Sequence, residues 1–326
     1  AQIHLRRGER AEARDVYRSY LSDFPEGRRW DEASYWSGRL MLEAGDTVEG
    51  APLLRSIGRR NPISYYAVQA AALLGEPYRL PPESGPPPQP LSDELAAGLR
   101  LVYLLTAAGL EEGRSATLDA LLERADTAPG GEVLELAREL LARGLTVEAV
   151  NLGWALRGRG MAWNRALLET TYPFPHREMV VRAARERGLD PMLVAAVIRQ
   201  ESVFDADIVS AAGAVGLMQV LPGTGRDLAR EEGPADFSVR SLEAPEVNLH
   251  LGTRFFRDLW DRFGRDLPLV LSAYNAGPTR ATRWRRFPEA ADALRFTERI
   301  PFRETRDYVK QVTRNVTLYR TLYGSS

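Results

Sequence analysis

The sequence has 326 residues, of which 44% are hydrophobic and 27% charged, so it is long enough to form more than one globular domain with its own core. Its 43 basic and 44 acidic residues nearly cancel, which gives no reason to expect a nucleic-acid partner. The absence of cysteine excludes disulfides and thiolate chemistry, and a total of three histidines argues against a metal site.

The first residues form a helical pattern without a targeting signal. The chain opens with AQIHLRRGERAEA, which lacks the charged and then apolar start of a signal peptide. We expect Ala1 to lie inside a longer protein whose export signal precedes it. No run of about 18 apolar residues appears, so no membrane span is expected in this chain.

Residues 1–80 show the pattern of paired helices separated by glycine turns. The spacing Leu-x-x-Gly-x-x-x-Glu begins at Leu5 and returns at Leu42, close to the period of paired-helix repeats. A looser echo begins at Leu141, with a counterpart around Gly109. Each glycine is expected to end a helix in the left-handed conformation, and each Glu to lie in the first turn of the next helix. We therefore predict a helical-repeat region over 1–80.

A proline-rich stretch interrupts this pattern at residues 81–91. The segment LPPESGPPPQPLS holds six prolines, which a helix interior cannot accommodate, so it is a loop or a linker. Helical periodicity returns over 92–168, which we assign to a helical linker domain, and TTYPFPHRE marks the entry to a last domain over 169–326. Alternation typical of strands is hard to find anywhere, and the predicted fold class is all-α.

The last domain contains a helix that carries a carboxylate on an apolar face. Asp190 is a suitable N-cap, Pro191 suits the first helical position, and LVAAVIRQES follows. Glu201 shares one face of this helix with Val194 and Ile198. Taken alone, the residue is more simply interpreted as a solvated glutamate at a frayed helix end. The alternative is a catalytic acid, because burial of a carboxylate raises its pKa.

Small residues follow this helix in ESVFDADIVSAAGAVGLMQVLPGTG, which predicts a tight turn packed against the helix end. Ser210 and Gln219 offer hydrogen bonds to a polar ligand. Met218 offers an adaptable apolar wall, although a core position is the simpler interpretation of a methionine. Further on, Tyr274 and Asn275 precede a Gly-Pro helix stop, where the tyrosine either reaches a shared cleft or lies half-buried in the core.

In this order the segments resemble the catalytic domain of the soluble lytic transglycosylases, whose fold is similar to goose-type lysozyme. The resemblance covers about 150 residues and rests on ESVF, SAAGAVGLMQVLPGT, NLHLGTRFFRDL, AYNAGPTRATRW and ERIPFRETRDYVKQV. Upstream, ASYWSGRLMLEAGDTVEGAPLLRSI and NPISYYAVQAAALLG resemble the helical-repeat superhelix of that family. The expected architecture is a superhelical N-terminal region followed by a lysozyme-like α-helical catalytic domain.

The resemblance also implies the roles of individual residues. Glu201 is expected to be the single catalytic acid/base. The residues expected to bind substrate are Ser210, Met218, Gln219, Tyr274 and Asn275, with supporting roles for Asn248, Glu304 and Tyr308. The chain departs from the family at Ile208, where Ala is usual, and at Ala211, where Pro is frequent. Both changes are apolar and lie outside the expected chemistry.

The activity implied by the resemblance is that of a peptidoglycan lytic transglycosylase in the bacterial periplasm. Such an enzyme cleaves the β-1,4 bond between N-acetylmuramic acid and N-acetylglucosamine and forms 1,6-anhydromuramic acid. Groups of the substrate then replace the second carboxylate that most glycosidases use. Asp205 and Asp207 are the nearest candidates for such a carboxylate, and we interpret both as solvated loop residues. Two alternatives stay open: a hydrolytic muramidase on the same fold, and a non-catalytic glycan-binding scaffold.

Peptidoglycan glycan strands are the partner that the resemblance implies, without a metal, a cofactor or a nucleic acid. The helical repeats are expected either to guide glycan strands to the cleft or to dock other cell-wall enzymes. Paired-helix repeats are suited to both tasks because they present extended surfaces.

Overall fold

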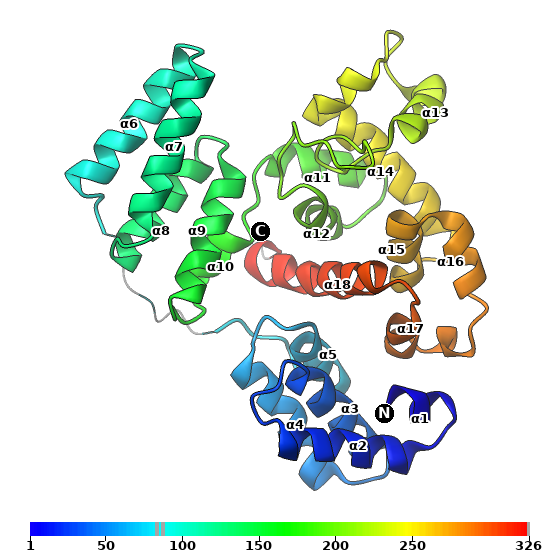
Figure 1. Cartoon of the computed structure of the whole chain (residues 1–326). Helices are drawn as coiled ribbons and strands as arrows, with labels where there is room; N and C mark the ends of the chain where they lie inside the picture. Colours follow the sequence, from blue (N-terminus) through cyan, green and yellow to red (C-terminus); the bar gives the residue numbers. More distant parts are fainter. Residues whose placement is uncertain (82–84, 86–88, 325–326) are drawn as a thin grey trace. The chain divides into compact units, whose positions relative to one another are not determined.

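Helices make up most of the described chain. The computed structural model describes residues 1–81, 85 and 89–324. Within these ranges the only β-structure consists of isolated bridges, which confirms the predicted all-α fold class. The chain divides into two compact units, one formed by Ala1–Leu80 with Phe255–Ser326 and the other by Pro81–Arg254 (Figure 1).

These units differ from the domains assigned to the sequence. The predicted boundary after residue 80 coincides with a boundary between units, whereas the predicted catalytic domain, 169–326, contributes to both units. Most of the predicted proline-rich segment, at 82–84 and 86–88, lies outside the described residues. The division into sequence domains therefore stays a prediction.

The first unit joins two helical segments that are far apart in the sequence. Its N-terminal helices are α1 (Gln2–Arg6), α2 (Arg10–Asp23), α3 (Trp30–Glu43), α4 (Thr47–Arg60) and α5 (Tyr65–Leu74). Its C-terminal elements are the end of α14 (Pro245–Arg262), α15 (Leu267–Ala276), α16 (Pro278–Trp284), η2 (Pro288–Ala291), α17 (Ala293–Arg299) and α18 (Arg303–Tyr323). Helices α2 to α5 pack against one another in chain order, and α18 packs against both α5 and α15.

The core of this unit is rich in aromatic side chains. Tyr17, Trp36 and Leu54 are buried in one cluster contributed by α2, α3 and α4. Gly50 allows α3 and α4 to approach closely, because a Cβ atom there would lie only 2.9 Å from the carbonyl oxygen of Gly38. Packing of amphipathic faces, rather than helix propensity alone, therefore fixes the helix pairs.

A buried polar cluster connects α5 to α17 and α18. The ammonium group of Lys310 donates to the Glu298 carboxylate at 2.9 Å and to the Tyr66 hydroxyl oxygen at 2.8 Å. The Tyr66 hydroxyl in turn donates to Glu298 at 2.5 Å. Burial and the neighbouring Glu298 charge raise the pKa of Tyr66 well above its usual range. Because Glu298 is only 7% exposed, its charge depends on these two partners.

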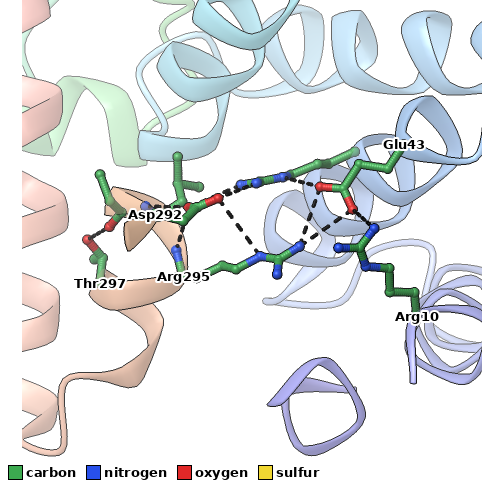
Figure 2. A network of polar contacts seen from close by, with 8 residues as sticks. Arg10, Glu43, Asp292, Arg295 and Thr297 are labelled. Carbon is green, nitrogen blue, oxygen red and sulfur yellow. Dashed lines mark hydrogen bonds and ion pairs between the residues drawn. The ribbon is translucent and has the colours of Figure 1, made fainter. Parts of the chain in front are cut away.

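A second, more open network of charges joins α2 and α3 to α17 (Figure 2). Arg39 donates to Glu43 on its own helix at 3.0 Å and binds the Asp292 carboxylate at the start of α17. Arg10 and Arg295 both reach the Glu43 carboxylate, each at 3.5 Å. Alternating charges thus connect residues that are about 250 positions apart in the sequence.

The second unit contains the remaining helices. They are α6 (Asp93–Ala107), α7 (Glu111–Ala125), α8 (Gly130–Leu141), α9 (Thr146–Gly158), α10 (Arg165–Thr171), α11 (Arg177–Glu186), α12 (Pro191–Glu201), α13 (Pro222–Glu232), η1 (Val239–Glu243) and the start of α14. The pairs α6–α7, α8–α9 and α11–α12 pack together. Between α12 and α13 the chain forms an irregular loop, residues 202–221, closed by the antiparallel bridges Val209–Val215 and Val215–Val220.

The glycines of the predicted repeat spacing separate helices as expected. Gly8, Gly45, Gly109 and Gly144 all have φ between 68° and 87°, in the left-handed region. They lie between α1 and α2, α3 and α4, α6 and α7, and α8 and α9. The sequence prediction of glycine-terminated helix pairs is therefore confirmed. Across the described ranges, no helix combines the length and hydrophobicity needed to cross a bilayer.

Candidate functional site

Helix α12 begins as the sequence predicts and places Glu201 at its end. The Asp190 side chain accepts a hydrogen bond from the Met192 backbone N–H at 2.9 Å, and Pro191 occupies the first helical position. Every residue from Met192 to Ile198 is buried, so the helix is enclosed on all sides rather than along one stripe. Glu201, its last residue, is half-buried. A rigid, buried helix thus ends in a carboxylate that remains partly accessible.

The residues after Glu201 adopt an uncommon backbone conformation. Val203 and Phe204 lie in the left-handed region, with φ of 54° and 63°. Ser202 is 1% exposed, and its hydroxyl donates to the carbonyl oxygen of Leu217 at 2.9 Å. This hydrogen bond ties the end of α12 to the far side of the 202–221 loop, next to the predicted substrate-binding residues.

Ser210 stabilises the turn of this loop. Its backbone N–H donates to the Ala214 carbonyl at 2.9 Å, and its hydroxyl oxygen accepts from the Ala214 N–H at 3.0 Å. The residue is half-buried. Its hydroxyl hydrogen can still be directed to a ligand, because the oxygen acts only as an acceptor in the turn.

Gln219 folds back onto the same loop. Its φ is 49°, and its side-chain amide nitrogen donates to the carbonyl oxygens of Ile208 at 3.1 Å and Gly216 at 3.0 Å. The amide oxygen is then the part of the side chain suited to accept a hydrogen bond from a ligand. Gln219 therefore holds the loop together in addition to the binding role predicted from the sequence.

Met218 lies in the core of the second unit. Its side chain is 0% exposed and packs so closely on α14 that a Cβ atom at Gly252 would lie 2.7 Å from its sulfur. A fully buried side chain offers no surface to a sugar, so the structure supports the simpler interpretation of this methionine and not the predicted cleft wall. Its backbone N–H donates to the side chain of Asn248 at 2.8 Å.

Asn248, predicted to have a supporting role, is a buried hydrogen-bonding centre. Besides accepting from Met218, its amide nitrogen donates to the carbonyl oxygens of Val215 and Leu242, each at 2.8 Å. The side chain is 0% exposed and bonds only to backbone groups. Asn248 thus connects α14 to the 202–221 loop and positions that loop without contact to solvent.

Four of the predicted residues belong to the other unit. The ring of Tyr274 packs against Phe255 and Phe256, with centroid distances of 5.5 and 5.6 Å. Asn275 is half-buried, and its side-chain oxygen accepts from the Thr305 hydroxyl at 2.7 Å.

The hydrogen bond between Thr305 and Asn275 connects the end of α15 to the first turn of α18. Helix α18 also carries Glu304 and Tyr308. Glu304 is exposed, whereas Tyr308 is 6% exposed and packs inside the unit. Sequence reasoning did not identify Thr305, which is 2% exposed and fixes the amide orientation of Asn275.

Asp205 and Asp207 have the geometry of turn residues. The Asp205 carboxylate accepts from the backbone N–H of Asp207 at 2.9 Å, and the Asp205 N–H donates to the Ser202 carbonyl at 3.0 Å. This arrangement is an Asx turn, which an aspartate stabilises without any catalytic role. Asp207 is exposed. Both observations support the interpretation of these residues as loop aspartates.

Sequence reasoning did not identify an apolar surface on the same loop. Ile208, Val209 and Leu221 are 37%, 56% and 47% exposed. The sequence signals this surface only by placing apolar residues in a loop that is too short to form a core of its own. Among the described residues, no group of three or more His, Cys, Asp or Glu side chains could hold a metal ion.

Comparisons with known proteins find similarity to lytic transglycosylases. Residues 178–296 match the family model described as "Transglycosylase SLT domain". This span includes all the predicted site residues except Glu304 and Tyr308. The chain is also 29% identical over 315 residues to the soluble lytic murein transglycosylase of Salmonella typhimurium, covering 94% of this chain and 46% of the relative.

Two solved structures are similar over nearly the whole chain. One is the lytic transglycosylase Slt from Pseudomonas aeruginosa, as an inactive mutant in which Gln replaces Glu. Its TM-score is 0.80 and its sequence identity 26%, and the similarity covers 98% of this chain and 50% of that chain. The other is the 70 kDa soluble lytic transglycosylase from Escherichia coli, with a TM-score of 0.78, 27% identity and coverage of 95% and 50%. The chain spans about half the length of these relatives.

Proposed function

The chain belongs to the soluble lytic transglycosylase family, and from this premise we propose that it is a peptidoglycan lytic transglycosylase with Glu201 as its single acid/base. The bond cleaved is the β-1,4 linkage between N-acetylmuramic acid and N-acetylglucosamine, and the product is 1,6-anhydromuramic acid. The observation that carries the proposal is the half-buried carboxylate at the end of the enclosed helix α12, within the matched transglycosylase domain. The inactive Glu-to-Gln mutant of the Pseudomonas aeruginosa relative supports a glutamate in this role.

In the proposed reaction one carboxyl group acts twice. Protonated Glu201 donates its proton to the glycosidic oxygen as the bond from that oxygen to C1 of the muramic acid breaks. The neighbouring 2-acetamido group stabilises the positive charge that develops at C1. The ionised Glu201 then accepts the proton of the C6 hydroxyl as the C6 oxygen bonds to C1. Glu201 returns to its protonated form, and no water is consumed.

The other residues are proposed to bind and position the glycan. Ser210 and Gln219 offer a hydroxyl hydrogen and an amide oxygen from the loop that follows Glu201. From the family resemblance, Tyr274 and Asn275 are also proposed to bind substrate, with supporting roles for Glu304 and Tyr308. The exposed side chains of Ile208, Val209 and Leu221 provide an apolar surface for the C–H faces of sugar rings.

Replacement of Glu201 by glutamine is the direct test. The variant keeps the size and hydrogen-bonding capacity of the side chain but cannot donate an acidic proton, so we expect it to fold normally. Because a positioned general acid contributes roughly a hundredfold or more, release of soluble muropeptides should fall by at least that factor. The matched controls Asp205→Asn and Asp207→Asn should retain activity, since both aspartates are assigned to a turn.

Analysis of the products distinguishes the proposal from its alternatives. A transglycosylase yields anhydromuramic ends, which mass spectrometry finds lighter than reducing ends by one water molecule. Reducing ends would instead identify a hydrolytic muramidase on the same fold. Absence of any muropeptide release, with glycan binding that is unaffected by Glu201→Gln, would identify a non-catalytic glycan-binding scaffold.

We also propose that the protein acts in the bacterial periplasm, where peptidoglycan is accessible to it. The name of the Salmonella typhimurium relative, a soluble lytic murein transglycosylase, supports this location. The helical repeats are proposed to guide glycan strands or to dock other cell-wall enzymes. Co-purification of wall enzymes with α1 to α5 intact, and its loss on substitution of exposed repeat residues, would support the docking role.

A further inference from the structure

Four arginines are concentrated around α16, in a stretch of the chain without acidic residues. Residues 267–288 contain no aspartate or glutamate, although the whole chain has a formal net charge of -1. The arginines of this stretch are Arg280, Arg283, Arg285 and Arg286, and all four side chains are exposed. Positive charge therefore accumulates locally at α16, which packs beside α15 in the first unit (Figure 1).

Three of these arginines share one face of α16. Arg280, Arg283 and Arg286 are spaced at i, i+3 and i+6, and positions three apart are neighbours on a helix surface. The backbone N–H of Arg286 donates to the carbonyl oxygen of Arg283 at 3.2 Å, so the turn continues beyond the last helical residue, Trp284. The other side of the helix is packed, because Ala281 is 0% and Trp284 7% exposed. We call the three residues Arg280, Arg283 and Arg286 the arginine ridge.

The protein supplies no counter-charge to the outer part of the ridge. Within the described residues, the guanidinium groups of Arg283 and Arg286 make no hydrogen bond or ion pair. The next acidic residue along the chain, Glu289, lies 3.6 Å from Arg299. Like charges at this spacing destabilise a helix slightly, and no acidic partner offsets the cost here. The ridge is therefore accessible to an anion from outside the chain.

Arg280 connects the ridge to the end of α15. Its Nη1 donates to the carbonyl oxygen of Ala276 at 2.8 Å, and its guanidinium lies over the ring of Phe302, 5.3 Å from the centroid. Ala276 directly follows Asn275, which is proposed to bind substrate. The ridge thus begins at the helix end that carries a proposed substrate-binding residue.

The chemistry of the ridge favours a ligand with several carboxylates. A guanidinium binds a carboxylate through two parallel hydrogen bonds, and a ridge about 9 Å long can contact more than one carboxylate of a flexible ligand. An anionic membrane fits less well, because helices that lie on membranes need a wide exposed apolar face. On α16 the apolar side chains of Ala281 and Trp284 are buried against the protein instead.

We propose that the arginine ridge binds the carboxylates of the peptide stem of a glycan strand whose sugars bind next to Asn275. This inference rests on the proposed function, which supplies the glycan strand. Because a peptide stem adds several carboxylates to the strand, the ridge makes the protein prefer peptide-bearing strands to bare glycan. The ridge selects the substrate and takes no part in bond cleavage.

Binding to the intact Glu201→Gln chain tests the ligand chemistry, since this variant leaves the ligand uncleaved. The probes are N-acetylglucosaminyl-N-acetylmuramyl tetrapeptide, the same compound with amidated peptide carboxylates, and the peptide-free disaccharide. Calorimetry should show the first compound binding about tenfold more tightly than the other two. This advantage should shrink in about 1 M salt, which screens exposed ion pairs. Equal affinities of the three compounds, or no saturable binding of the first, would overturn the proposal.

Charge-neutralising variants locate the site. Arg283→Gln combined with Arg286→Gln removes two exposed charges without a described partner, so folding stays intact, and binding of the tetrapeptide compound should weaken about fivefold. The matched control combines Arg262→Gln with Arg285→Gln, which removes two exposed charges of the same unit that lie off the ridge. The control should change the affinity by less than about twofold. Unchanged affinity in the ridge variant, or an equal loss in the control, would refute the assignment.

Two further outcomes separate this inference from its alternatives. The parent chain could bind vesicles of phosphatidylglycerol and phosphatidylcholine and lose that binding in the ridge variant, with muropeptide affinity unchanged. This result would identify a membrane-binding surface and overturn the proposal. A parent chain that releases no muropeptides would refute the proposed function. The ridge assignment would still stand if the Glu201→Gln chain kept its preference for the tetrapeptide compound and lost it on substitution of the ridge.

Discussion

Replacing Asn248 by alanine tests how the 202–221 loop is held in place. The substitution removes three hydrogen bonds of 2.8 Å from a side chain that is 0% exposed. The carbonyl oxygen of Val215 keeps a second donor, the N–H of Val220, at 3.0 Å. The N–H of Met218 and the carbonyl oxygen of Leu242 each lose a hydrogen bond to the asparagine side chain. Each buried group left unsatisfied costs about 1–3 kcal/mol, so the free energy of unfolding should fall by about 3–5 kcal/mol.

Two measurements check this magnitude. Urea unfolding should show the loss of stability, and amide hydrogen exchange should show reduced protection at Met218, whose N–H loses its hydrogen bond to the asparagine side chain. The control Glu246→Ala changes an exposed residue on the same helix and should alter stability by less than about 1 kcal/mol. A loss below about 1 kcal/mol in Asn248→Ala, with full protection at Met218, would refute the role assigned to the asparagine.

Three further changes probe other parts of the structure. In Gly216→Ala the new Cβ would lie 2.3 Å from the side-chain nitrogen of the buried Asn248, and the φ of 75° is unfavourable for alanine. Thermal unfolding should therefore show a loss of stability of more than about 3 kcal/mol. In Gly213→Ala the φ is similar but the space around the new Cβ is open, so the loss of stability should be about 1 kcal/mol. Lys310→Met leaves the buried Glu298 carboxylate without its cation, so the free energy of unfolding measured in urea should fall by about 3–5 kcal/mol. Adding Glu298→Gln should restore much of that stability. Burial alone would raise the pKa of Asp292, but hydrogen bonds and the charges of Arg39 and Arg295 lower it overall. The ionised Asp292 therefore stabilises the folded protein above the unfolded-state pKa, and this contribution is lost as the pH falls through the folded-state pKa. Asp292→Asn should therefore unfold more easily at neutral pH and show a shallower loss of stability in acid.

Local features of the structure could be predicted from the sequence because they depend on neighbouring residues. Left-handed glycines such as Gly45 and Gly144 end helices through their own backbone freedom, and the spacing of the repeat reveals them. The start of α12 follows in the same way, since Asp190 caps it and Pro191 fits its first turn. These signals were sufficient to place Glu201 at the end of a helix.

Roles that depend on distant residues could not be predicted in this way. Gln219 is recognisable as a polar residue in a loop, but its hydrogen bonds to Ile208 and Gly216 depend on the path of that loop. The sequence predicts Met218 at a cleft wall, and only the position of α14 shows that it is buried against Gly252. Thr305 carried no signal, because its contact with Asn275 joins residues 30 positions apart.

The backbone after Glu201 shows where local prediction ends. A non-glycine residue in the left-handed region costs about 1–2 kcal/mol, and the β-branched Val203 is among the least suited to it. Burial of the Phe204 ring, which is 3% exposed, offsets this by about 2–3 kcal/mol, and the Ser202 hydrogen bond to Leu217 adds to it. The chain therefore leaves α12 in a direction that tertiary contacts impose against local preference. Backbone strain maintained in this way is concentrated at functional sites, because it fixes side chains that local preference would leave mobile. By this argument the strained pair Val203–Phe204 and the buried Asn248 together hold the loop that carries Ser210 and Gln219, while the orientation of Glu201 follows from the enclosed helix before it.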